Sequence, residues 1–119
     1  MNGLGAYQET AVLTQDKGKL IVMLYEGAIK FLKLSLNEIE AGNHEARNTY
    51  INKGWDIINE LNVSLDMEGG GEISENLRKL YSFMLSHLSR ANINNDSQGV
   101  QEVIDMLVEL KQGWEAITE

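Results

Sequence analysis

The feature that most constrains the fold of this chain is an apolar pattern with a period of three to four residues that no proline interrupts. The 119 residues include no proline, and long stretches are rich in Leu, Ile, Glu and Lys, which favour helix over sheet. Apolar residues three and four apart lie on one face of an α-helix. A chain of this length buries about two thirds of its unfolded surface in one core. The sequence therefore predicts a single all-α domain.

Four helical segments are predicted, at residues 16–41, 44–67, 72–94 and 97–117. Asp16 is a good N-cap for the first segment, and Gly42-Asn43 is typical of a turn that ends a helix. Short connections between helices indicate antiparallel neighbours. The sequence thus predicts an antiparallel, up-down-up-down four-helix bundle over residues 16–119, preceded by a short mobile N-terminal segment, residues 1–15.

The apolar residues of these segments form stripes, and more of them are present than a small bundle requires. The stripe of the third segment is Ile73, Leu77, Leu80, Tyr81, Met84, Leu88 and Ala91, and that of the fourth is Val100, Val103, Ile104, Leu107, Leu110, Trp114 and Ile117. The first segment carries two neighbouring stripes, one through Leu20 and Phe31 and one through Tyr25 and Leu32. This surplus predicts an elongated surface for an apolar, helical partner.

Composition and charge exclude several functions. Ten basic and 18 acidic residues give a formal net charge of −8, and nucleic-acid binding depends on Lys and Arg, so nucleic acid is not expected as a partner. The absence of cysteine excludes disulfides and thiolate metal sites and fits a reducing compartment. The N-terminus lacks a secretory signal, and no apolar stretch approaches the roughly 20 residues of a membrane span. We therefore expect a cytoplasmic protein without direct membrane insertion.

The glycine triplet Gly69–Gly71 is the most conspicuous local motif. A phosphate-binding loop follows a strand and carries Lys, whereas this triplet follows a helix and precedes Glu72. A calcium loop alternates its oxygen ligands, but Asp66 and Glu68 run directly into the glycines. The triplet therefore predicts a chain reversal, in which glycine adopts a positive φ at little steric cost.

The sequence gives no support for a metal site, a cofactor or enzyme activity. The Glu-x-x-His pairs of metal-binding bundles are absent, because neither His44 nor His87 follows a glutamate by three residues. The carboxylates are typical of solvated helix faces that also carry Lys and Arg. One alternative stays open: His87, followed by Arg90, is similar to the exposed histidine of histidine phosphotransfer bundles, which accepts phosphate from a response regulator.

Three stretches in order along the chain resemble the flagellin export chaperone family, FliS. They are YEGAIKFL in the first segment, SLDMEGGGEISENLRKLYSFM across the glycine triplet, and ANINND leading to LVELKQGW in the fourth segment. The resemblance covers about residues 6–116. It implies a helical bundle that binds the disordered C-terminal segment of flagellin, keeps flagellin from polymerising in the cytoplasm and helps to deliver it to the flagellar type III export gate.

The start of the first segment departs from the family pattern. Members usually begin this helix with Ser-Pro-Glu-Lys, whereas Asp16 is followed here by Lys-Gly-Lys, and the loss of proline and gain of glycine loosen the helix start. The resemblance implies that residues 1–15, in which Tyr7 matches the family's N-terminal tyrosine, lie over the client groove and move aside on binding. A frayed tail is the alternative for these residues.

The client surface is predicted from apolar residues of the four segments together with the N-terminal tyrosine. The predicted contact residues are Tyr7, Tyr25, Ile29, Leu36, Trp55, Phe83, Met106 and Val108. The expected partners are the C-terminal segment of flagellin and a component of the export gate. We expect a monomer or a weak dimer, since an uncovered apolar strip favours weak self-association. A purely structural or dimeric bundle without a client is the remaining alternative.

Overall fold

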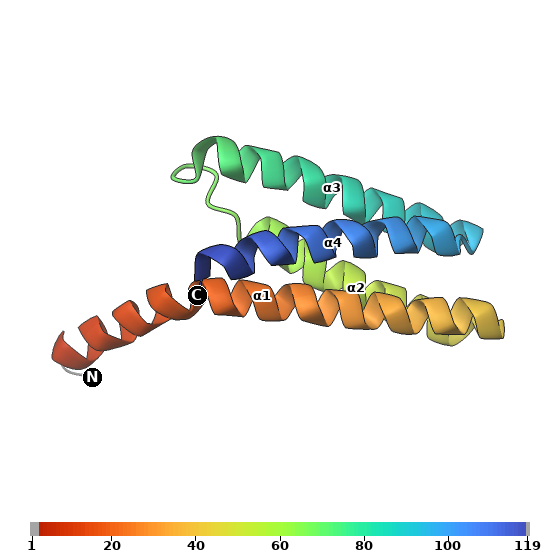
Figure 1. Cartoon of the computed structure of the whole chain (residues 1–119), viewed down its shortest axis with the longest axis horizontal. Helices are drawn as coiled ribbons and strands as arrows, with labels where there is room; N and C mark the ends of the chain where they lie inside the picture. The colour runs from red at the N-terminus through yellow and green to blue at the C-terminus, as the bar shows by residue number, and fades with distance from the viewer. Residues whose placement is uncertain (1–2, 119) are drawn as a thin grey trace.

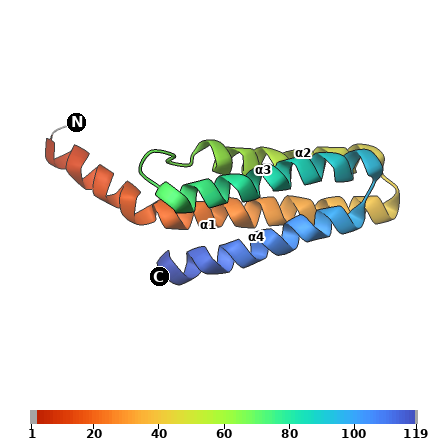
Figure 2. The same cartoon turned by 90° about the horizontal axis from the view of Figure 1, so that it is seen from above.

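The computed structural model describes the backbone of residues 3–118 and the side chains of residues 17–117. The described backbone forms four helices, α1 (Gly3–Ala41), α2 (His44–Val63), α3 (Gly71–Asn94) and α4 (Ser97–Thr118), and no strand. Successive helices run in opposite directions, as Figure 1 and Figure 2 show, and α1 and α3 each pack against both α2 and α4. The predicted four-helix bundle is therefore confirmed.

Two helix boundaries differ from the predicted ones. α1 begins at Gly3 and continues through Asp16, so Asp16 is not an N-cap; without proline, nothing in this stretch forces the helix to start there. α2 ends at Val63 instead of residue 67. The reason is the side chain of Asp66, whose Oδ1 accepts hydrogen bonds from the backbone N–H groups of Glu68 (3.2 Å) and Gly69 (2.8 Å) and holds the chain in a turn.

The glycine triplet forms the chain reversal that the sequence predicted. Gly71 has a φ of 55°, in the left-handed region that favours glycine. A Cβ atom added to Gly70 would clash with Ser74 Oγ and with the backbone oxygen of Asp66. Residues 64–70 therefore make a tightly folded connection between α2 and α3, and the end of the bundle that contains them is called the open end below.

The opposite, closed end holds the two short connections, residues 42–43 and 95–96. Gly42 (φ 75°) and Asn95 (φ 53°) take the left-handed conformation that ends α1 and α3. Arg47, near the start of α2, donates hydrogen bonds to the side-chain oxygens of Asn92 (3.1 Å) and Asn95 (2.9 Å) at the end of α3. Backbone turns and polar side chains together fix this end of the bundle.

The core consists of residues from all four helices. Its buried apolar members are Tyr25, Ala28, Ile29, Leu32, Ile51, Ile58, Leu61, Leu77, Tyr81, Met84, Leu88, Ala91, Val100, Val103, Ile104 and Leu107. Three residues that the sequence placed on core stripes are instead exposed: Ile73 (71%), Leu80 (36%) and Ile117 (74%). These three residues belong to α3 and α4, and the two helices separate toward the open end (Figure 1). No neighbouring helix therefore covers the three side chains.

Candidate functional site

An apolar cavity of about 390 Å³ lies at the open end, where α3 and α4 separate. Its apolar lining consists of Leu20, Ile21 and Leu24 of α1, Leu61 of α2, Leu65 of the connection, Ile73, Leu77 and Tyr81 of α3, and Trp114 of α4. The exposed residues Lys17, Glu60 and Asp66 add charged groups to the same lining. Ligand sites in proteins commonly measure roughly 300–1,000 Å³ and are mostly apolar with a few polar groups, and this cavity fits that description.

A network of three aromatic side chains connects the cavity wall to the core. The hydroxyl groups of Tyr25 and Tyr81 share a hydrogen bond, and Trp114 Nε1–H donates to the Tyr25 hydroxyl at 3.1 Å. Burial raises the pKa of both tyrosines above the ordinary value of 10.0, because a phenolate here would lose its hydration. Both hydroxyls stay neutral at physiological pH, and the network joins α1, α3 and α4 into a fixed wall.

Exposed apolar side chains continue from the cavity along α3. Ile73, Leu80 and Phe83 recur at intervals of seven and three residues, which places them on one side of the helix. One turn beyond Phe83, His87 Nε2 lies 3.0 Å from Glu102 Oε2 of α4, so this side of α3 faces α4. The α3 strip, defined as Ile73, Leu80 and Phe83, therefore extends the apolar surface of the cavity toward the middle of the bundle.

Comparison with known proteins identifies the family. The model of the family described as flagellar protein FliS matches residues 1–119 of this chain. The chain belongs to the FliS family. The FliS family predicted from three sequence motifs is thereby confirmed.

Characterised members of the FliS family align with nearly the whole chain. The flagellar secretion chaperone FliS of Salmonella typhimurium is 36% identical over 122 residues, covering 98% of this chain and 90% of the relative. FliS of Vibrio cholerae is 36% identical over 118 residues (96% and 87%), and FliS of Bacillus subtilis is 34% identical over 113 residues (95% and 84%). These relatives are named as chaperones. The sequence predicted a chaperone and no enzyme activity.

Two of the three FliS motifs line the cavity, and the first motif supports it from behind. The first motif begins at Tyr25, directly after the lining residue Leu24, and contributes Tyr25 to the aromatic network behind the lining. The second, Ser64–Met84, includes the whole connection between α2 and α3 and several lining positions. The third ends at Trp114, which lines the cavity from α4. Residues far apart in the sequence are thus brought to one site by the folding of the bundle.

Two of the predicted contact residues lie in the core instead of on the surface. Tyr25 is fully buried and Ile29 is 8% exposed, because the stripe of α1 that contains Tyr25 and Leu32 is the one that faces the bundle interior. Tyr25 is further held by its hydrogen bonds to Tyr81 and Trp114. As the helices are placed, neither residue presents a side chain to a partner. The side chain of Tyr7 lies outside the described residues.

The other predicted contact residues are spread over the bundle. Phe83 belongs to the α3 strip, and Met106, one helical turn after Glu102, lies on the side of α4 that faces α3. Trp55 is half-buried between α2 and α3, where its Nε1–H donates to the backbone oxygen of Leu85 at 3.1 Å.

Leu36 and Val108 are both half-buried and pack against the core. Leu36 lines a separate depression at the closed end, between α1 and α4. The structure therefore brings Phe83 and Met106 to one side of the bundle and leaves Trp55, Leu36 and Val108 elsewhere.

Sequence reasoning missed most of the cavity lining. Leu77 and Trp114 were assigned to core stripes, since helical periodicity does not distinguish a residue that faces a filled core from one that faces a cavity. The available signal was the connection between α2 and α3, which is longer than the two at the closed end. A long connection allows the start of α3 to move away from α4, and the space between them becomes the cavity.

His87 is less suited to phosphate transfer than the sequence suggested. Its Nε2 atom lies within hydrogen-bond distance of Glu102 Oε2 (3.0 Å), and its ring stacks on Phe83 with 5.0 Å between centroids. Residues 17–117 contain no group of three His, Asp or Glu side chains placed to hold a metal ion. In the described part of the chain, no helix combines the length and the apolar character that crossing a bilayer requires.

Proposed function

We propose that this chain is a cytoplasmic export chaperone that binds the disordered C-terminal segment of flagellin, called the client below. The observation that carries the proposal is the apolar cavity of about 390 Å³, which two of the FliS motifs line and the first supports through Tyr25. Ile73 and Leu80 of the α3 strip continue this surface and offer a track for a helix of the client. The names of the relatives, flagellar secretion chaperones, support the same assignment.

Binding of the client would be coupled to its folding. Apolar side chains of the client enter the cavity and gain roughly 25 cal/mol per Å² of apolar surface removed from water. The client orders itself at the same time, which lowers the net affinity for a given buried area. Apolar residues that are covered in this way are not available for polymerisation of flagellin. The complex of one chaperone and one client is then delivered to the flagellar type III export gate.

Residues 1–15 have a part in this proposal as a cap. In the structure, residues 3–15 continue α1 beyond the open end of the bundle (Figure 1). A cap therefore requires this segment to fold back over the cavity in the absence of the client and to move aside when the client binds. Deletion of residues 1–15 should therefore change the dissociation constant of the client, measured by titration calorimetry. An unchanged constant would show that the segment is only a tail.

The proposal is tested by titrating the chaperone with the C-terminal segment of flagellin from the same organism. The double variant Leu20→Glu, Ile73→Glu places two carboxylates at exposed positions of the cavity lining. Contact between these charges and apolar client side chains is unfavourable, so we expect affinity to fall by about 100-fold or more. The control is Ile93→Glu, which adds one carboxylate at a residue that is 83% exposed near the closed end.

Circular dichroism completes the experiment. A helical signal of the complex larger than the sum of its separate components would show that the client folds on the chaperone. Failure of the unmodified chaperone to bind the client, or equal affinities of the double variant and the control, would refute the proposal.

A further inference from the structure

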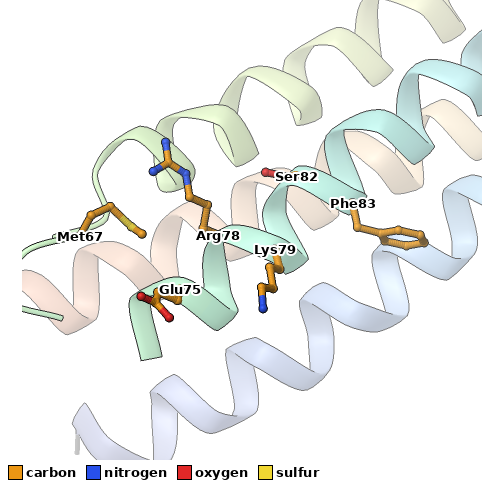
Figure 3. A pocket seen from close by; sticks show the side chains of 6 residues that line it. All are labelled: Met67, Glu75, Arg78, Lys79, Ser82 and Phe83. Carbon is orange, nitrogen blue, oxygen red and sulfur yellow. The ribbon is translucent and has the colours of Figure 1, made fainter. Parts of the chain in front are cut away.

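A second hollow lies on the outer face of α3, away from the cavity. This depression of about 640 Å³ is lined by Met67, Glu75, Arg78, Lys79, Ser82 and Phe83. Figure 3 shows Met67 and Phe83 at its two ends, with the side chains of Arg78 and Lys79 between them. The same part of α3 has Leu77 and Tyr81 on its inner side, in the cavity lining. Two different surfaces therefore share one short stretch of helix.

The outer face of α3 differs in charge from the rest of the protein. The charged side chains that line the hollow are two cations, Arg78 and Lys79, and one carboxylate, Glu75, so the lining is net positive although the chain has 18 acidic residues and a formal net charge of −8. Among the side chains that the structure describes, neither Arg78 nor Lys79 forms an ion pair. Both cations are exposed. They leave a local positive potential on an acidic protein, which attracts a negatively charged partner.

An exposed aromatic ring lies beside these cations. Phe83 is 45% exposed, and its ring stacks on that of His87, with 5.0 Å between centroids and 20° between planes. The hydrogen bond between His87 and Glu102 helps to hold the stack in place. Exposed aromatic and Arg side chains commonly dominate the energetics of protein interfaces, and a ring that is already ordered lowers the entropic cost of binding.

We infer that this outer face of α3 binds an acidic, partly apolar segment of a second protein while the client occupies the cavity. The inference rests on the proposed function, because a second partner is required for delivery of a bound client. Carboxylates of the segment pair with Arg78 and Lys79, and an apolar side chain packs between Met67 and Phe83. The net charge of the chain opposes nucleic acid as the occupant.

The test uses a fluorescently labelled synthetic peptide with Glu and Leu at helical spacing, and fluorescence anisotropy as the readout. The double variant Arg78→Glu, Lys79→Glu removes the positive charge of the outer face. The matched control Lys30→Glu, Lys33→Glu makes the same change in net charge at two exposed lysines of α1. We expect the unmodified protein and the control to bind the peptide with equal affinity. The affinity of the outer-face variant for the peptide should be lower by about tenfold or more.

Further measurements separate this inference from the proposed function. Saturation with the client should leave the affinity for the peptide unchanged, and the outer-face variant should bind the client normally in calorimetry. If the peptide binds but the client does not, the proposed function is refuted, whereas the outer face of α3 still binds an acidic segment.

Four results of the binding experiments would overturn the inference. They are absence of peptide binding, equal weakening by both double variants, displacement of the peptide by the client, and tighter binding of a single-stranded oligonucleotide than of the peptide. A dimer of the unmodified protein in sedimentation that the outer-face variant loses would assign the face to a second copy and would also overturn it.

Discussion

The α1–α2 pair and the α3–α4 pair are packed in different ways, and the difference separates stability from binding. α1 and α2 make the most extensive contact in the bundle, and a Cβ atom added at Gly54 would lie only 2.7 Å from Leu32 Cδ2. α3 and α4 make the least extensive contact and separate toward the open end (Figure 1). A Cβ atom added at Gly113 of α4 would meet nothing within 4 Å. The first pair buries most of its large apolar side chains but exposes Leu20, Met23 and Val63, and the second pair exposes more of them: Ile73, Leu80, Phe83, Ile93 and Ile117.

The largest effect on stability is expected from Gly54→Val in the α1–α2 contact. Valine needs space that the side chain of Leu32 and the backbone of Ala28 already fill, so the helices must move apart or Leu32 must change rotamer. Overpacking of this kind costs about 3 kcal/mol in the free energy of unfolding. Urea denaturation followed by circular dichroism measures this loss. A midpoint equal to that of the unmodified protein would show that the pair is not closely packed.

The next effect is expected from Tyr25→Phe, which removes the hydroxyl that links the two helix pairs. Tyr81 loses its hydrogen-bond partner and Trp114 Nε1–H loses an acceptor, at a cost of about 2 kcal/mol in the free energy of unfolding. Tyr50→Phe is the matched control, because the ring of Tyr50 stacks on Phe31 of α1 and its hydroxyl forms no hydrogen bond with a described residue. Equal denaturation midpoints for the two variants would contradict the importance of the network.

The same two tyrosines predict how stability depends on pH. Burial raises the pKa of Tyr25 and Tyr81 above 10.0 in the folded protein, so unfolding releases groups that ionise more readily. Their contribution to stability is fully present below pH 10 and is lost as the pH rises from there toward their folded pKa values. Thermal unfolding measured between pH 8 and pH 11 should show a decline that begins near pH 10 and is smaller in Tyr25→Phe. An equal decline in both proteins would assign the pH dependence to other groups.

The fold was largely predictable from the sequence because helical periodicity and turn residues act locally. Gly42 ends α1 and Asn95 ends α3 through left-handed backbone conformations that their residue types favour. The end of α2 was predicted four residues late, since the turn formed by Asp66 competes with a helix that periodicity alone would continue. Where one local signal dominated, the prediction was confirmed.

The site was less predictable because it depends on how the helices are placed. Leu77 is 9% exposed and lines the cavity, whereas Ile73, one turn earlier on the same stripe, is 71% exposed. Tyr25 shows the opposite case, since it was expected at the surface and lies in the core. The first outcome follows from the separation of α3 and α4, and the second from which of the two α1 stripes faces the bundle interior; no single stripe encodes either arrangement.

The smallest effect is expected from Gly113→Ala on α4, and its sign tests the comparison between the two pairs. The new methyl group meets no atom within 4 Å, so alanine gains only from its higher helix propensity, worth up to about 1 kcal/mol. At Gly27 of α1 the same change places Cβ 3.3 Å from Ile57 Cδ1, and the contact should cancel part of that gain. Urea denaturation should rank Gly113→Ala above Gly27→Ala in stability. The reverse order would mean that α3 and α4 close together in solution, and the cavity at the open end would then be smaller than the structure shows.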